Sequence, residues 1–138
     1  MLVLAVDDVE QSLKMVDLVH EHFPNLQIVA RARDVTHWNK LRDRGVMRVE
    51  RELFESSLRS GRSVLELLGH SAHEARQTAM RFRTHNLELF EKMHPHYTDR
   101  TKLIAVIKQG RAQLEEQMAQ ERAERAQRRP RGWDSSDD

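Results

Sequence analysis

The segment Leu26–Asp34 constrains the fold most strongly, because it combines a strand of buried type with a cluster of charge. Its first part, Leu26–Ala30, is mostly apolar and includes β-branched residues, which is typical of a strand. Arg31, Arg33 and Asp34 follow. Parallel sheets bind ligands in the crevice at the carboxyl ends of their strands, so these charges mark a candidate binding edge. The alternative is that Arg31 and Arg33 are solvated charges in an ordinary loop between a strand and a helix.

Strands and helices alternate along the first 50 residues. The predicted elements are a strand over Leu2–Val6, a helix capped by Asp7 or Asp8 and ended by Pro24, a strand over Leu26–Ala30, a short helix capped by Asp34 and stopped by Gly45, and a strand over Val46–Val49. Continuous apolar runs are typical of strands in parallel α/β sheets. The pattern predicts an α/β fold with half of a Rossmann-like parallel sheet, in the order βαβαβ. No glycine-rich phosphate loop follows the first strand, so we expect the mononucleotide-binding half to be missing from this chain.

The remainder of the chain has helical patterns only. Residues 51–127 are expected to form a helical extension that serves dimerisation and ligand binding, with one helix from about Arg51 to Gly69, one from about Ser71 to Met93, and one that begins near Asp99. Pro95 breaks the chain between the last two helices. Residues 128–138 are expected to be a flexible tail. The predicted division is therefore 1–50, 51–127 and 128–138.

Composition excludes several classes of protein. The formal net charge of +1 argues against a dedicated nucleic-acid binder, which concentrates positive charge. The chain has no cysteine, which excludes disulfides, thiolate metal sites and cysteine catalysis. No apolar run approaches the roughly 20 residues needed to cross a bilayer, so we expect a soluble chain.

The polar residues form no evident catalytic set. The eight histidines do not show the spacing of a metal site: the sequence names no third ligand for His70 and His73, and His94 and His96 flank a proline. Four serines, from Ser56 to Ser63, lie on a predicted helix rather than on a strand-to-helix elbow. We therefore expect neither a metal site nor an enzyme.

A set of ordered motifs runs through the chain. It comprises Ala30-Arg31-Ala32-Arg33-Asp34, Leu41-Arg42, Gly45-Val46, Glu50-Arg51-Glu52 with Phe54, Glu74-Ala75-Arg76, Phe82-Arg83 with Asn86, and Gly132-Trp133. In order and spacing these motifs resemble the cytosolic regulatory domain, called KTN or RCK, of Kef-type glutathione-regulated potassium efflux antiporters. The resemblance covers nearly the whole chain. The sequence differs from that family in lacking both the membrane domain and the glycine-rich first half.

This resemblance implies a function for the chain. It would be the last half of a ligand-sensing domain that binds glutathione or its adducts and controls K⁺/H⁺ antiport at the cytoplasmic face of the bacterial inner membrane. The implied partners are a second copy of the chain, the antiporter domain of the parent protein, and an ancillary flavin-containing quinone oxidoreductase. No cofactor is expected in this half, although an AMP- or NAD-type nucleotide is possible in the full domain.

The resemblance also implies site residues. Arg51 and Asn86 match the family's glutathione contacts, and Asp34 and Arg33 are weaker candidates. These residue types suit the ligand, because arginine holds carboxylates bidentately and asparagine both donates and accepts. Two alternatives remain open. Val6-Asp7-Asp8 resembles the start of a response-regulator receiver domain, although no lysine stands at the end of a later strand. The chain could also be a structural dimerisation module that binds no ligand.

Overall fold

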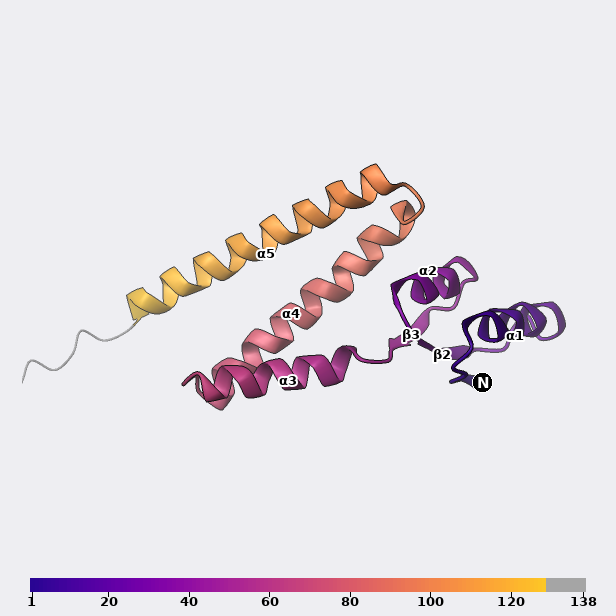
Figure 1. The fold of residues 1–138 in the computed structure, drawn as a ribbon, viewed down its shortest axis with the longest axis horizontal. Coiled ribbons are helices and arrows are strands. Elements are labelled where there is room, and N and C mark those ends of the chain that lie inside the picture. The colour runs from indigo at the N-terminus through magenta and orange to yellow at the C-terminus, as the bar shows by residue number, and fades with distance from the viewer. Residues whose placement is uncertain (129–138) are drawn as a thin grey trace, which may run out of the picture. The chain divides into compact units, whose positions relative to one another are not determined.

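The computed structural model describes residues 1–128. An α/β segment comes first: β1 (Leu2–Leu4), α1 (Val9–His22), β2 (Ile28–Ala32), α2 (Val35–Asp43) and β3 (Arg48–Arg51). A helical segment follows: α3 (Phe54–Leu67), α4 (Ala72–Met93), the 3₁₀ turn η1 (His94–His96) and α5 (Arg100–Arg128) (Figure 1). By its internal contacts the chain divides into two units, Met1–Glu88 and Leu89–Asp138.

The three strands form one parallel sheet in the order β1-β2-β3. The pairs Leu4–Ala30 and Ala30–Val49 define its register. The predicted α/β fold, with three parallel strands followed by helices, is therefore confirmed. Among the described residues no strand occurs after Arg51.

The strand boundaries differ from the prediction. β1 ends at Leu4 rather than Val6, and β2 and β3 each begin and end two residues later than expected. Backbone pairing explains why β2 and β3 extend past their apolar residues. Arg31 pairs with Glu50, and Ala32 pairs with Arg51, so the two strands continue into charged sequence. Arg51 is thus the last residue of β3, and the following helix begins at Phe54 rather than near Arg51.

The core of the first unit lies between the sheet and the two connecting helices. Alternate residues of β2 are buried, as expected for a strand with one well-covered face. Helix α2 contacts β2, β3 and helix α1. The largest buried apolar side chains of this core are Leu4, Leu13, Val16, Ile28, Trp38 and Leu41.

The helix ends use local sequence signals. The Asp8 side chain accepts from the backbone N–H of Gln11 at 2.8 Å, so Asp8 caps α1. Gly45, at φ 77°, ends α2 as predicted. The Gly45 N–H donates to the carbonyl of Arg42 and the Val46 N–H donates to the carbonyl of Leu41, which is the Schellman arrangement.

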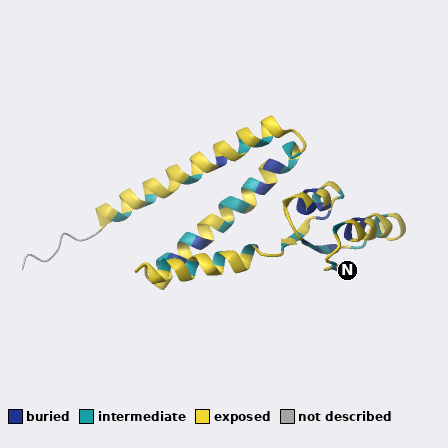
Figure 2. Cartoon of the chain, in the orientation of Figure 1, coloured by how far each residue is buried: buried dark blue, intermediate teal, exposed yellow. Residues whose placement is uncertain are grey.

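Helix α3 has no buried residue within the chain (Figure 2). Several large apolar side chains around it are exposed: Leu53 (69%), Val64 (56%), Leu67 (89%) and Leu68 (73%). Helix α4 buries Ala75 and Ala79 instead. The apolar face of α3 is thus only partly covered by this chain.

The second unit packs around the turn at η1. Phe90 and Met93, at the end of α4, are buried. Gly110 of α5 is buried as well, and a methyl group there would lie 2.7 Å from Leu89 Cδ1. The small residue permits this close approach. The predicted tail over 128–138 lies outside the described residues except for Arg128, which ends α5.

Truncation of Leu41 should test the core of the first unit. Leu41 is fully buried, so Leu41→Ala should reduce the free energy of unfolding by about 2–5 kcal/mol through lost apolar contacts and a cavity. Leu18 on α1 is 55% exposed, and the matched variant Leu18→Ala should change it by less than about 0.5 kcal/mol. Urea denaturation followed by circular dichroism measures both. Equal losses in the two variants would contradict this description of the core.

Candidate functional site

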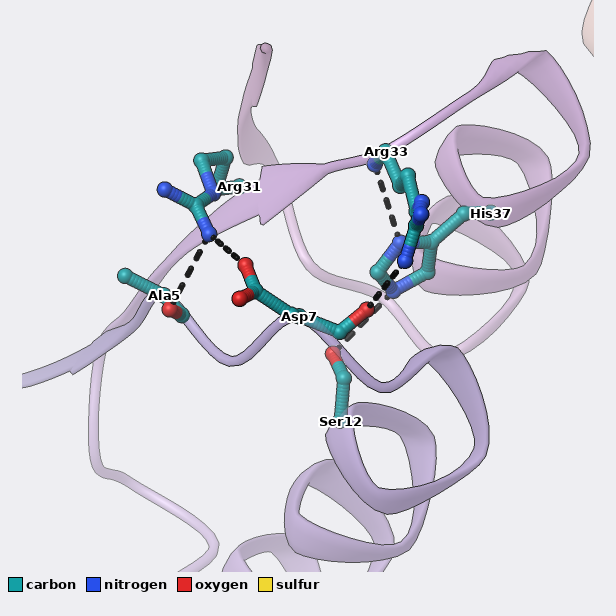
Figure 3. Close-up of polar contacts among 6 residues, drawn as sticks. All are labelled: Ala5, Asp7, Ser12, Arg31, Arg33 and His37. Atoms are coloured by element: carbon teal, nitrogen blue, oxygen red, sulfur yellow. Dashed lines mark hydrogen bonds and ion pairs between the residues drawn. The ribbon is translucent and has the colours of Figure 1, made fainter.

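Charged side chains gather at the carboxyl edge of the sheet, where β1 and β2 end. Arg31 Nη2 donates to Asp7 Oδ1 at 2.5 Å and to the Ala5 carbonyl at 3.3 Å (Figure 3). Arg33 Nη1 donates to the Asp7 carbonyl at 3.4 Å. Both arginines therefore hold the loop that follows β1. The predicted charge cluster at a strand end exists, but much of its hydrogen-bonding capacity is used within the chain.

His37 lies beneath this cluster and is 1% exposed. Its Nδ1 accepts from the backbone N–H of Arg33 at 3.1 Å, and its Nε2 lies 3.1 Å from Ser12 Oγ. Since Nδ1 accepts, the neutral ring carries its proton on Nε2, and this N–H donates a hydrogen bond to Ser12 Oγ. The ring thus connects the end of β2 to α1 from its place on α2.

Burial is the main cause that lowers the pKa of His37. The Asp34 carboxylate opposes the shift and the Lys40 ammonium adds to it. The hydrogen bonds agree with this direction, because a proton on Nδ1 would face the Arg33 N–H.

The two weaker site candidates, Asp34 and Arg33, differ in their contacts. Asp34 Oδ1 accepts from the His37 backbone N–H at 2.7 Å and caps α2, as the sequence predicted. Arg33 is exposed and lies at the same edge of the sheet as Arg51, because Ala32 pairs with Arg51. Neither placement tests whether these residues contact a ligand.

Arg51 lies where β3 gives way to α3. Its guanidinium carbon is 3.6 Å from the centroid of the Phe54 ring, a cation–π contact that fixes the direction of the side chain. Burial is the main cause that lowers the pKa of Arg51. Glu55 opposes this shift and Arg83 adds to it, so these two charges lie within electrostatic range of Arg51. The guanidinium stays protonated at physiological pH.

Helix α4 brings Arg83 and Asn86 to this region. The two residues are three apart and so share a face of the helix. Arg83 Nε donates to Glu55 Oε1 at 2.6 Å, which ties this face to the first turn of α3. The Oδ1 atom of Asn86 is buried, and within the described part of the chain it accepts no hydrogen bond. A buried acceptor of this kind costs free energy unless a donor reaches it.

The prediction singled out Arg51 and Asn86 but not Glu55 or Arg83 as site residues. Helical spacing was the signal that could have found Arg83, because it lies one turn before Asn86. Glu55 lies four residues after Arg51 and so is a possible local partner of that residue. Its pairing with Arg83 joins residues 28 positions apart, and no local pattern indicates it.

Two further observations concern metal binding and membrane spans. Over residues 1–128 no group of three or more histidine and carboxylate side chains is placed to hold a metal ion. In the same range no helix combines the length and apolar character that a bilayer span requires.

The family assignment comes from comparison with known proteins. Residues 56–132 match the family described as the potassium efflux system KefB C-terminal domain. The matched region is more than half of the chain, and the chain belongs to this family. The receiver-domain alternative is thereby set aside.

Curated relatives agree with this assignment. The chain is 40% identical, over 137 residues, to glutathione-regulated potassium-efflux system proteins named KefC from Escherichia coli and Shigella boydii. The alignments cover 99% of this chain but 22% of each relative. The chain therefore spans about a fifth of the length of these relatives.

A solved structure described as the Kef CTD of Shewanella denitrificans in AMP-bound form has the same fold. It is 34% identical to this chain, with a TM-score of 0.66, and the match covers 67% of this chain and 59% of that one. The Rossmann-like α/β fold expected from the resemblance is thus the fold of a Kef C-terminal domain.

Stability should depend on the protonation of His37. Because folding lowers its pKa, the unfolded chain binds more protons as the pH falls below the usual histidine value near 6.5. The contribution of neutral His37 is complete above that pH and is lost as the pH falls toward the lower folded value. Urea denaturation between pH 7.5 and pH 5 should show a decline that His37→Gln flattens. His22→Gln, at an exposed histidine, should keep the decline, and an unchanged slope in His37→Gln would refute this role.

Proposed function

We propose that this chain is the ligand-sensing part of the regulatory domain of a glutathione-gated potassium efflux system, in which it binds glutathione or its adducts to control K⁺/H⁺ antiport. Family membership and the names of the KefC relatives support this proposal. Because the chain spans a fifth of those relatives, transport itself would belong to the rest of a longer protein.

The observation that carries the proposal is the cluster around Arg51. A partly buried guanidinium, oriented by the Phe54 ring, lies within electrostatic range of Arg83. One helical turn beyond Arg83, Asn86 presents a buried carbonyl oxygen that accepts no hydrogen bond from the described residues. Cationic donors and a buried, unsatisfied acceptor thus come from β3 and α4 of the same unit.

This set of groups suits a small anionic peptide. Glutathione carries two carboxylates, one ammonium group and two amide N–H groups. Arg51 would bind a carboxylate with charge-assisted hydrogen bonds. Asn86 Oδ1 would accept from an ammonium or amide N–H of the ligand, which would satisfy the buried oxygen.

Arg33 and Asp34 have a smaller part in the proposal. Arg33 is exposed and can approach a ligand from the sheet edge. Asp34 already caps α2 through Oδ1, so its second oxygen is the one available for a ligand donor. Their contribution would be secondary to that of Arg51 and Asn86.

The remaining assignments follow from the same proposal. The chain would have no catalytic activity of its own and would hold no cofactor. A nucleotide such as AMP would bind the glycine-rich half of a longer protein, by analogy with the AMP-bound Shewanella domain. The chain would lie at the cytoplasmic face of the inner membrane, joined to the antiporter domain. It would bind the flavin-containing quinone oxidoreductase as an ancillary subunit and would bind no nucleic acid.

Calorimetric titration of glutathione into the chain tests the site. Arg51→Ala and Asn86→Ala should each weaken binding, because each removes a contact to a charged group of the ligand. The loss should be about 1.5–3 kcal/mol, or roughly 10- to 100-fold in affinity. Arg59→Ala, at an exposed arginine of α3, is the matched control and should bind like the parent. If the two site variants also bind like the parent, or if the parent does not bind, the assignment is wrong.

We also propose that the chain forms a homodimer through its helical segment. Over residues 1–128 the sheet has two unpaired edges, and the apolar side chains around α3 are largely exposed. Exposed apolar surface of this kind is typical of an interface between subunits. A dimer that binds no ligand is the remaining alternative, and the titration above distinguishes it.

Sedimentation velocity at micromolar concentration tests the dimer. The parent should sediment at about twice the 16.2 kDa of one chain. Replacing Leu67 and Leu68 together by arginine should shift it toward the monomer, because charge would enter the apolar face. The control Leu18→Arg, on α1, should leave the dimer intact. A parent that sediments as a monomer would contradict the proposal.

A further inference from the structure

Glu55 lies between two arginines that come from different elements. Arg83 of α4 donates its Nε to Glu55 Oε1 at 2.6 Å. Glu55 also acts on Arg51 of β3, where it favours the protonated guanidinium. One carboxylate in the first turn of α3 therefore balances charges from both neighbouring elements.

The three side chains Arg51, Glu55 and Arg83 together carry positive charge. Their two guanidinium groups and one carboxylate sum to +1. Glutathione, with two carboxylates and one ammonium group, has a net charge of −1. The cluster therefore complements a ligand of this class in sign and in magnitude.

Arg83 keeps donors available for such a ligand. Its pairing with Glu55 uses Nε, and over the described residues its terminal Nη groups make no hydrogen bond. The Arg83 side chain is 35% exposed, so these groups can be reached from solvent. Because Arg83 and Asn86 share one face of α4, a molecule held by the Asn86 oxygen would meet the Arg83 guanidinium.

We propose that Arg83 is a further ligand-binding residue, which holds a carboxylate of an anionic peptide of the glutathione class, and that Glu55 is its positioning residue. This inference rests on the proposed glutathione site at Arg51 and Asn86. Glu55 orients Arg83 through Nε, which turns its Nη groups outward, and reduces the repulsion between the two guanidiniums. The ligand carboxylate then completes the neutralisation of the pair.

The competing explanation is that the Arg83–Glu55 pair only fastens α3 to α4. Exposed ion pairs of this kind contribute little to stability, and Glu55 is 58% exposed. A fastening role predicts changes in unfolding but no dependence on the chemistry of the ligand. Pairing with a specific carboxylate is therefore the property to measure.

The test combines changes in the protein with changes in the ligand. Glutathione, its glycine-carboxamide and its γ-glutamyl α-carboxamide are titrated calorimetrically into the parent, Arg83→Gln and Arg83→Lys. Arg83→Gln should weaken binding of glutathione about tenfold or more, and Arg83→Lys should recover part of the loss. Amidation of the carboxylate that Arg83 holds should weaken binding to the parent but cause almost no further loss in Arg83→Gln. Arg76→Gln, on the exposed surface of α4, is the matched control.

Glu55→Gln tests the positioning role in the same titrations. It should weaken binding of glutathione, because Arg83 loses its orienting partner, and should leave the thermal unfolding midpoint nearly unchanged. Tighter binding by Glu55→Gln would make Glu55 a competitor of the ligand and would overturn its assigned role.

Other outcomes separate the two proposals. If Arg51→Ala loses binding while Arg83→Gln binds like the parent, the glutathione site stands and the role of Arg83 is wrong. Additive losses on Arg83→Gln for both amidated ligands would also refute that role. If neither Arg51→Ala nor Asn86→Ala affects binding, or if the parent binds no glutathione, the proposed function fails and this inference fails with it.

Discussion

The first unit depends on β2, because it is the one strand that is paired on both sides. Its buried residues face the core and its last residues bring charge to the edge of the sheet. His37 fastens this end through the Arg33 backbone and through Ser12 of α1. A buried polar group is stabilising only when its partners are in place, so the central strand and the two covering helices are coupled in one hydrogen-bonded unit.

The two charged clusters at the strand ends differ in how they are neutralised. At β2, Arg31 is satisfied by Asp7 and by a backbone carbonyl. At β3, Glu55 accepts a hydrogen bond from Arg83 and also favours the charged form of Arg51. The first cluster therefore stabilises a loop, while the second places two guanidinium groups within electrostatic range of each other. An anionic ligand is attracted to the second cluster, which is consistent with a sensing role for the residues that follow the sheet.

If the proposed ligand site and the proposed dimer are both correct, helix α3 would join them. Helix α3 carries Glu55 at its start, and exposed leucines occupy and follow its end. A ligand that orders the start of this helix would also order the surface that we assign to the dimer. Such a link would require that the ligand interact differently with two states of the protein.

The sequence by itself determined the class of fold, the order of the elements, and the caps at Asp34 and Gly45, because periodicity and capping are local properties. Arg51 and Asn86 were expected from the family resemblance and not from these local patterns. The sequence did not determine where the strands end. The pairing of Ala32 with Arg51 extends β3 past its apolar residues, and that pairing depends on a neighbouring strand. Only the tertiary structure brought Glu55 to Arg83 and His37 to Ser12. These contacts join residues 28 and 25 positions apart, and no local pattern encodes such distances.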